Sequence, residues 1–188
     1  MKIIGLSGSI AGNKTRIAVN YTLKKIKELS PEMGVELVDL ADYNMQFSDG
    51  RDYRDYTGDT KKLIEKLIQA DAYVIGTPTY QSSIPGVLKN VFDLLPVDSF
   101  KDKVISIIST AGSEKHYLSA EYQLKPILYY MKAIVVPKYV FLEDKHYRAG
   151  EIVADDISFR LERLAQDTLD SIDSYKILLQ RKEDSYDF

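Results

Sequence analysis

Short apolar runs alternate with stretches of helical period along most of the chain. Runs without polar alternation are typical of strands covered on both faces, whereas apolar residues three or four apart form one face of a helix. The runs predict strands at 3–6, 34–40, 72–76, 104–109 and 133–136, with 139–142 a candidate continuation of the last. The periodic stretches predict helices at about 15–29, 59–68, 85–95, 124–131 and 157–172.

Polar residues and prolines mark the expected ends of these elements. Asp59 is suited to cap the second helix, Pro85 to occupy the first turn of the third, and Pro126 to kink the fourth. Residues 41–58 are polar and rich in tyrosine, which predicts a long functional loop, either a lid or partner surface or an ordinary packed loop. The charged tail, 181–188, is expected to fray.

The order of these elements predicts the fold class. Five strand–helix alternations joined by right-handed crossovers give an α/β protein with an open, doubly wound parallel sheet. We find no repeat or second unit, so residues 1–188 are expected to form a single domain. In such a sheet, ligands bind beyond the carboxyl ends of the strands.

Composition narrows the classes of function. The 188 residues are 45% hydrophobic and 28% charged, as in ordinary globular proteins, and 25 basic against 28 acidic side chains leave a charge of −3. This balance gives no electrostatic sign of nucleic-acid binding. Cysteine is absent, which excludes disulfides and thiolate sites, and the opening apolar run is too short for a signal peptide or membrane span. We therefore expect a cytoplasmic protein without a membrane segment.

The loop after the first strand has the composition of a phosphate site. Residues 8–16 follow a strand and open a helix, and small residues there let backbone N–H groups converge on an anion. Ser9, Asn13 and Thr15 add hydroxyl and amide donors, and Lys14 or Arg16 can complement the charge. The alternative is a plain strand-to-helix turn.

Another phosphate motif must be weighed here. Residues 8–15 match a Walker A loop except that Asn13 replaces its second glycine, and Asp39 is the only weak candidate for its Mg²⁺ partner. The glycines do not have the dinucleotide-binding spacing, and a phosphatase loop would need a cysteine. A nucleotide-binding P-loop protein therefore stays an alternative.

Two further segments are expected at the same sheet edge. In 76–90, Pro78 and Pro85 stiffen a loop in which Tyr80 can lie along a flat ring, with the amides of 79–81 facing its polar edge. Ordinary surface packing is the alternative for Tyr80. The small residues of 109–113 allow close approach of a planar ligand.

These segments resemble the NADPH-dependent FMN reductase family, which includes azobenzene, chromate and quinone reductases. Residues 77–90 are similar to its signature after the third strand, and 15–18 to the start of its first helix. Residues 131–133 with 135–137 resemble the approach to its fifth strand. The likeness covers nearly the whole chain except 41–58 and the tail, and is strongest to azobenzene reductases.

The resemblance implies a flavodoxin-like three-layer fold with five parallel strands in the order 2-1-3-4-5. It also implies a homodimer or homotetramer with active sites near the subunit interface. It assigns the FMN phosphate and the flavin ring to two groups of residues. The phosphate group is Ser9, Asn13, Lys14, Thr15 and Arg16, and the ring group is Pro78, Thr79, Tyr80, Gln81 and Ser82, with Thr110, Ala111 and Gly112 on the other side.

Two positions depart from the family pattern. Ala11 stands where many members have arginine, so Lys14 or Arg16 would have to replace that charge. Residues 114–117 stand where many members have a second glycine-rich stretch, which leaves the rim of the site and the choice of substrate open.

The implied activity is an FMN-dependent NAD(P)H oxidoreductase. Electrons would pass by a ping-pong cycle from NADPH or NADH through FMN to a flavin, quinone, azo or similar small-molecule acceptor. The cofactor carries the chemistry, so we expect no catalytic side chain and no metal site; His116 and His146 are expected at the surface. The alternative from another class is a flavodoxin-like electron carrier or redox sensor.

Overall fold

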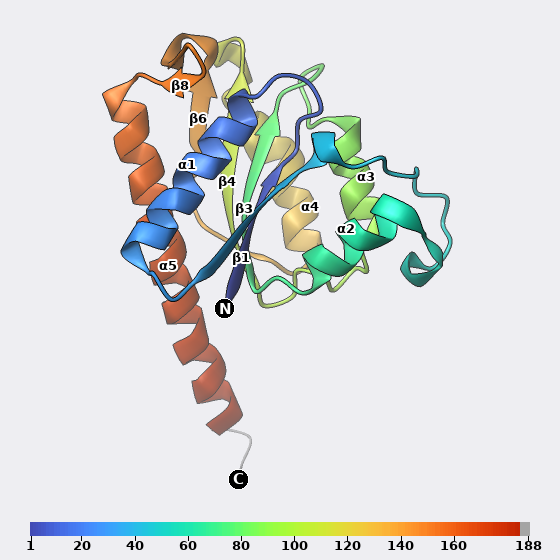
Figure 1. Cartoon of the computed structure of the whole chain (residues 1–188). Coiled ribbons are helices and arrows are strands. Elements are labelled where there is room, and N and C mark those ends of the chain that lie inside the picture. The colour runs from blue at the N-terminus through green and yellow to red at the C-terminus, as the bar shows by residue number, and fades with distance from the viewer. Residues whose placement is uncertain (185–188) are drawn as a thin grey trace.

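The computed structural model describes residues 1–184. Its centre is a parallel sheet with the strand order β2-β1-β3-β4-β5, and β6 also pairs with β4 (Figure 1). The strands are β1 Lys2–Ser7, β2 Gly34–Asp39, β3 Ala72–Pro78, β4 Val104–Ala111, β5 Ile134–Val135 and β6 Val140–Glu143. This flavodoxin-like order confirms the predicted fold class.

The fifth strand position is divided between β5 and β6. Strand β5 pairs with Val104 and Ile105 of β4, and β6 pairs farther along with 108–111 of the same strand. Pro137 lies in the connection and has no N–H to donate to a ladder. Strand β6 therefore continues the edge that β5 begins, as the apolar run at 139–142 suggested.

Helices cover both faces of the sheet, so the inner strands β1, β3 and β4 are buried as predicted (Figure 1). The helices are α1 Lys14–Leu29, α2 Gly58–Ile68, α3 Gly86–Leu94, α4 Lys125–Tyr130 and α5 Asp155–Asp184. One core, with residues such as Leu67, Val91 and Leu128, lies under α2, α3 and α4. The other, with Val19 and Leu164, lies under α1 and α5.

Helix α1 approaches the sheet closely where β3 carries Gly76. A Cβ on Gly76 would lie 2.4 Å from the Val19 side chain and 2.7 Å from that of Thr15. Any larger residue would push the first turns of α1 away from the sheet. The close approach brings the N-terminus of α1 over the carboxyl ends of the strands.

Three predicted helix starts differ in detail. Thr57 is the N-cap of α2, so Asp59 lies in the first turn instead of capping the helix. Pro85 is the N-cap of α3, one residue before the first turn. A π-helical turn, Ala120–Leu124, runs directly into α4, and Pro126 follows it as the second residue of α4. The helical stretch is thus irregular next to the proline, which has no N–H for the helix.

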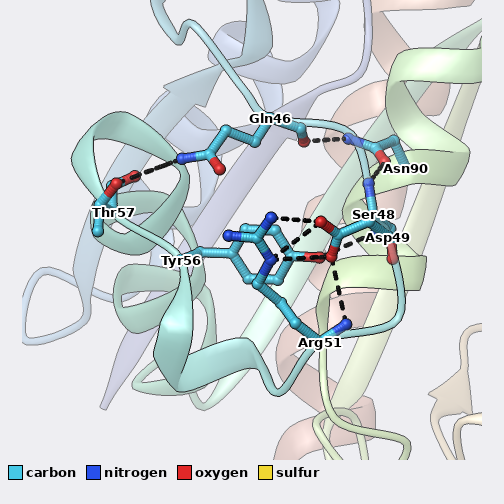
Figure 2. Close-up of polar contacts among 7 residues, drawn as sticks. All are labelled: Gln46, Ser48, Asp49, Arg51, Tyr56, Thr57 and Asn90. Atoms are coloured by element: carbon cyan, nitrogen blue, oxygen red, sulfur yellow. Dashed lines mark hydrogen bonds and ion pairs between the residues drawn. The ribbon is translucent and has the colours of Figure 1, made fainter.

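The predicted long loop forms a strap, residues 41–57, that packs on the α2–α3 side. Asn90 of α3 donates to the Gln46 carbonyl (3.0 Å) and accepts from the Ser48 amide (2.8 Å), as Figure 2 shows. Tyr56 is buried and donates to Asp49 (3.0 Å). Tyr43 and Tyr53 pack against the core. These contacts make the three tyrosines packing residues of the strap rather than a free lid.

The C-terminal part adds features that the periodicity did not predict. A short hairpin, β7 Tyr147–Arg148 and β8 Glu151–Ile152, follows β6. Helix α5 continues to Asp184, so the first half of the predicted frayed tail is helical, while 185–188 lie outside the described residues. Within residues 1–184, no helix is both long and apolar enough to cross a membrane.

Candidate functional site

Three loops meet at one edge because their strands are neighbours in parallel register. Ser7 of β1 pairs with Gly76 of β3, and Pro78 of β3 pairs with Thr110 of β4. The loops that follow enclose a cavity of about 300 Å³. Its walls are Ser9, Ala11, Gly12, Asn13, Lys14, Thr15, Pro78, Thr79, Tyr80, Thr110, Ala111, Gly112 and Asp144.

The N-terminus of α1 faces this cavity with its amides available. Asn13 is the N-cap residue, but its side chain makes no capping hydrogen bond. The first-turn N–H groups of a helix have no intrahelical acceptor, and they carry the positive end of the helix dipole. Gly12, just before, has φ of +72°, which favours glycine, and nothing lies within 4 Å of a Cβ placed there. This arrangement suits a bound anion.

Buried hydroxyls connect the loop after β1 to its neighbours. The Thr15 and Thr110 hydroxyl oxygens lie 2.8 Å apart, which joins α1 to the end of β4. The Ser9 hydroxyl donates to the Ala11 carbonyl at 2.7 Å and lies 3.3 Å from the Tyr80 hydroxyl. The phosphate loop and the Tyr80 loop are thereby connected.

Tyr80 is presented by a tight and strained turn. Tyr80 and Ser83 exchange two backbone hydrogen bonds, of 2.9 and 3.0 Å. The two residues between them, Gln81 and Ser82, have φ of 49° and 61°, the conformation of a type I′ hairpin turn. Residues other than glycine adopt it at a cost of about 1–3 kcal/mol, and such strain concentrates at functional sites. Gln81 and Ser82 are not among the residues that line the cavity, although they belong to the same turn as Tyr80.

Two carboxylates pair with the cations of the first loop. Lys14 Nζ lies 2.8 Å from Asp144 Oδ1, and Arg16 Nε lies 3.7 Å from Asp39 Oδ2. Tyr147 donates from its hydroxyl to the Lys14 carbonyl at 3.1 Å. Burial, with the charge of Asp144 adding to it, raises the pKa of the Tyr147 hydroxyl. The segment after β6 therefore forms part of this site.

The structure brings most of the predicted residues together. Those that line the cavity are Ser9, Asn13, Lys14, Thr15, Pro78, Thr79, Tyr80, Thr110, Ala111 and Gly112. Arg16, Gln81 and Ser82 lie outside the lining, Arg16 because it turns toward Asp39. Asp144 lines the cavity but was missed, since nothing in the sequence around it marks a binding residue. His146 accepts a hydrogen bond from the Glu143 amide (3.0 Å), a structural role.

A larger groove of about 880 Å³ lies elsewhere, along α5 and the connection between β5 and β6. None of the three loops contributes to it. In a doubly wound sheet the ligand site lies beyond the carboxyl ends of the strands, so we assign function to the smaller cavity.

Comparison with known proteins shows the family of the chain. The family model described as NADPH-dependent FMN reductase matches residues 1–147. The chain belongs to this family. It is therefore an oxidoreductase that uses FMN and a reduced nicotinamide nucleotide. Membership of this family also argues against the alternative that the chain is a nucleotide-binding P-loop protein.

Individual relatives extend over most of the chain. An NAD(P)H-dependent FAD/FMN reductase of Geobacillus thermodenitrificans is 42% identical over 166 residues, covering 88% of this chain and 90% of that protein. An NADPH azoreductase of a Bacillus species is 28% identical over 156 residues, covering 82% and 84%. The solved NAD(P)H:(acceptor) oxidoreductase of Paracoccus denitrificans has a TM-score of 0.72 and 20% identity, covering 93% and 98%, which shows the fold.

The residues at the cavity fit an FMN molecule chemically. The uncapped α1 amides suit its phosphate. The Thr79 Oγ1 atom is buried without a hydrogen-bond partner among the described residues, so it can bond to a polar ligand atom. At Gly112 the nearest atom to an added Cβ would be Asp144 Oδ2 at 3.8 Å, which leaves the backbone open to a flat ring.

Proposed function

We propose that the chain transfers electrons from NADPH or NADH, through FMN held at this cavity, to flavins, quinones or azo compounds. The observation that carries the proposal is the meeting of an uncapped helix N-terminus with the Tyr80 turn and the 110–112 backbone. The acceptor classes are supported by the names of the relatives, which include FAD/FMN reductase and azoreductase.

The chain's own residues bind and orient. The amides of α1 and the hydroxyls of Ser9 and Thr15 would hold the phosphate, with Asn13 and Lys14 beside it. Arg16 would add its charge from outside the lining if it turned from Asp39. Pro78, Thr79 and Tyr80 would lie along the ring, with Gln81 and Ser82 next in the same turn and the 110–112 backbone opposite. When bound, FMN supplies the redox chemistry, accepting a hydride and passing electrons on. Donor and acceptor would use this one site in turn, which would give ping-pong kinetics.

No side chain is needed as an acid or base in this scheme. Those around the cavity are hydroxyls, an amide and the charged pair Lys14–Asp144. They position the substrates and exclude water from the reacting face. Catalysis then depends on orientation and hydrogen bonding, and substitutions at the loops should affect binding before they affect the chemical step.

A homodimer or homotetramer is part of the proposal. Exposed aromatic side chains follow the third loop, among them Tyr122 (68% exposed) and Tyr130 (73% exposed). Exposed aromatic side chains of this kind are typical of interfaces. The segment that carries Tyr122 contacts the Tyr80 turn through Ser119 and Gln123. Sedimentation velocity measures the oligomeric state, and a monomer would contradict this part of the proposal.

A single FMN-binding domain in the cytoplasm stays a prediction, with which the absence of cysteine agrees.

The acceptor is tested by reoxidation. The FMN-loaded protein is reduced without oxygen by one equivalent of NADPH, and free FMN, a quinone or an azo dye is then added. We expect rapid return of the yellow flavin absorbance with at least one class. If NADPH reduces the flavin but none of the three acceptors reoxidises it, these acceptor classes are wrong. If neither NADPH nor NADH reduces the flavin, the alternative of an electron carrier or redox sensor is favoured.

A further inference from the structure

The cations expected to meet a phosphate are already paired with carboxylates. Lys14 lines the cavity and contacts Asp144, which lines it too, at 2.8 Å. Arg16 lies near the buried Asp39 and outside the cavity lining. The loop therefore offers a phosphate backbone amides and hydroxyls but little uncompensated positive charge.

Asp144 is held in place by the segment that carries it. The turn Asp144–His146 follows β6 directly, and its start is fixed by the bond from the Glu143 amide to His146 Nδ1, 3.0 Å long. Immediately after the turn, Tyr147 donates to the Lys14 carbonyl at 3.1 Å. The segment thus contacts both the ammonium group of Lys14, through Asp144, and the backbone carbonyl of Lys14, through Tyr147. These two contacts place the Asp144 carboxylate beside the phosphate loop.

We propose that Asp144 competes with the FMN phosphate for Lys14 and so limits the affinity of the site for FMN. This inference rests on the phosphate site of the proposed function. A phosphate monoester carries a charge of roughly −1.5 to −2 at pH 7, so a neighbouring carboxylate repels it while occupying the nearest cation. A flavin without a phosphate would be affected neither by the repulsion from Asp144 nor by the pairing of Lys14. The competition makes FMN exchangeable rather than permanently held.

The test is an equilibrium titration of the flavin-free full-length protein, followed by quenching of flavin fluorescence at low ionic strength. FMN and riboflavin, which lacks the phosphate, are compared in wild type and in Asp144→Asn. We expect the variant to bind FMN roughly fivefold more tightly, from Coulomb energies at this range in water, and riboflavin unchanged. The gain should shrink at about 0.5 M salt, where screening shortens the interaction.

Two further variants separate competition from a general change of charge. Asp173→Asn removes the same charge from the far part of α5, where Asp173 pairs with Lys176 at 3.5 Å, and should leave FMN affinity unchanged. In a Lys14→Met background the gain from Asp144→Asn should be smaller, because the contested cation is gone.

The outcomes are distinguishable. The inference is overturned if wild type prefers FMN to riboflavin but Asp144→Asn binds FMN no more tightly, or if the variant tightens both flavins equally. If neither wild type nor Asp144→Asn binds FMN more tightly than riboflavin, the phosphate site of the proposed function fails and the competition fails with it. If neither flavin binds, the proposed function itself is wrong.

Discussion

The side-chain hydroxyls of Thr15 and Thr110 lie 2.8 Å apart, and both side chains are buried. Thr15 belongs to the first turn of α1, and Thr110 is the penultimate residue of β4. Only one hydroxyl of such a pair can donate to the other, so the accepting hydroxyl keeps its own hydrogen for a further acceptor. Since both residues line the cavity, the pair fixes α1 to the sheet and leaves a donor at the cavity wall.

Replacing both Ser9 and Thr15 by alanine should weaken FMN binding about tenfold to a hundredfold, because two hydroxyls that can donate to a charged phosphate are lost, that of Ser9 after turning from the Ala11 carbonyl. Fluorescence titration measures the change. Riboflavin serves as the internal control, and its affinity should change far less. Unchanged FMN affinity in a folded double variant would show that the phosphate lies elsewhere.

Gly76→Ala should destabilise the fold by about 1–3 kcal/mol, because the new methyl group overlaps the side chains of Val19 and Thr15. The matched control is Gly86→Ala at the start of α3, where nothing lies within 4 Å of the added atom. That change should stabilise by about 0.4–1 kcal/mol. Urea unfolding measures both, and equal midpoints for the two variants would contradict the close approach of α1.

Asn90→Ala should loosen the strap. Its buried side chain forms hydrogen bonds with the Gln46 carbonyl and the Ser48 amide (Figure 2). Truncation removes both bonds and leaves the two backbone groups without this partner, at a cost of about 1–3 kcal/mol. The Ser48 amide should then exchange its hydrogen faster in native-state measurements. Asn44→Ala, at an exposed position of the same strap, is the control and should leave that rate unchanged. Equal protection in both variants would refute the role of Asn90.

Tyrosines with raised pKa values make stability depend on alkaline pH. Burial raises the pKa of Tyr139 from 10.0 to about 12, and burial raises those of Tyr73 and Tyr147 as well. Above pH 10 the unfolded chain loses protons that the folded chain keeps, so stability is full below that pH and falls as the pH rises toward 12. Tyr139→Phe should flatten the fall between these values in urea unfolding. An equally steep fall in the variant would contradict the assignment.

The sheet was predictable because burial on both faces leaves its strands without polar alternation. The runs at 72–76 and 104–109 lie within β3 and β4. The strand order, by contrast, came from the family resemblance, since local periodicity does not specify which strands pair. Helix ends were less predictable: Thr57 rather than Asp59 became the N-cap of α2, because both have capping-type side chains and sequence alone does not choose between them.

The site was predictable where its residues follow strands directly, as Ser9, Thr79 and Gly112 do. It was not predictable where tertiary geometry decides. Gln81 follows Tyr80 in sequence, but it lies in a left-handed turn and is not part of the cavity lining. Asp144 reaches Lys14 because β6, which pairs with β4, ends next to the first loop. The apolar run at 139–142 suggested a strand there, but it gave no indication of which residue the following side chain would contact.

The central claim is that FMN bound at this cavity is reduced by a nicotinamide nucleotide. The most direct test mixes FMN with an excess of the protein without oxygen, adds NADPH and then, if needed, NADH, and follows the yellow flavin absorbance. The account predicts that the absorbance is lost within seconds, while FMN without protein stays yellow. Bound flavin that stays yellow with both nucleotides, or a protein that binds no flavin, would contradict it.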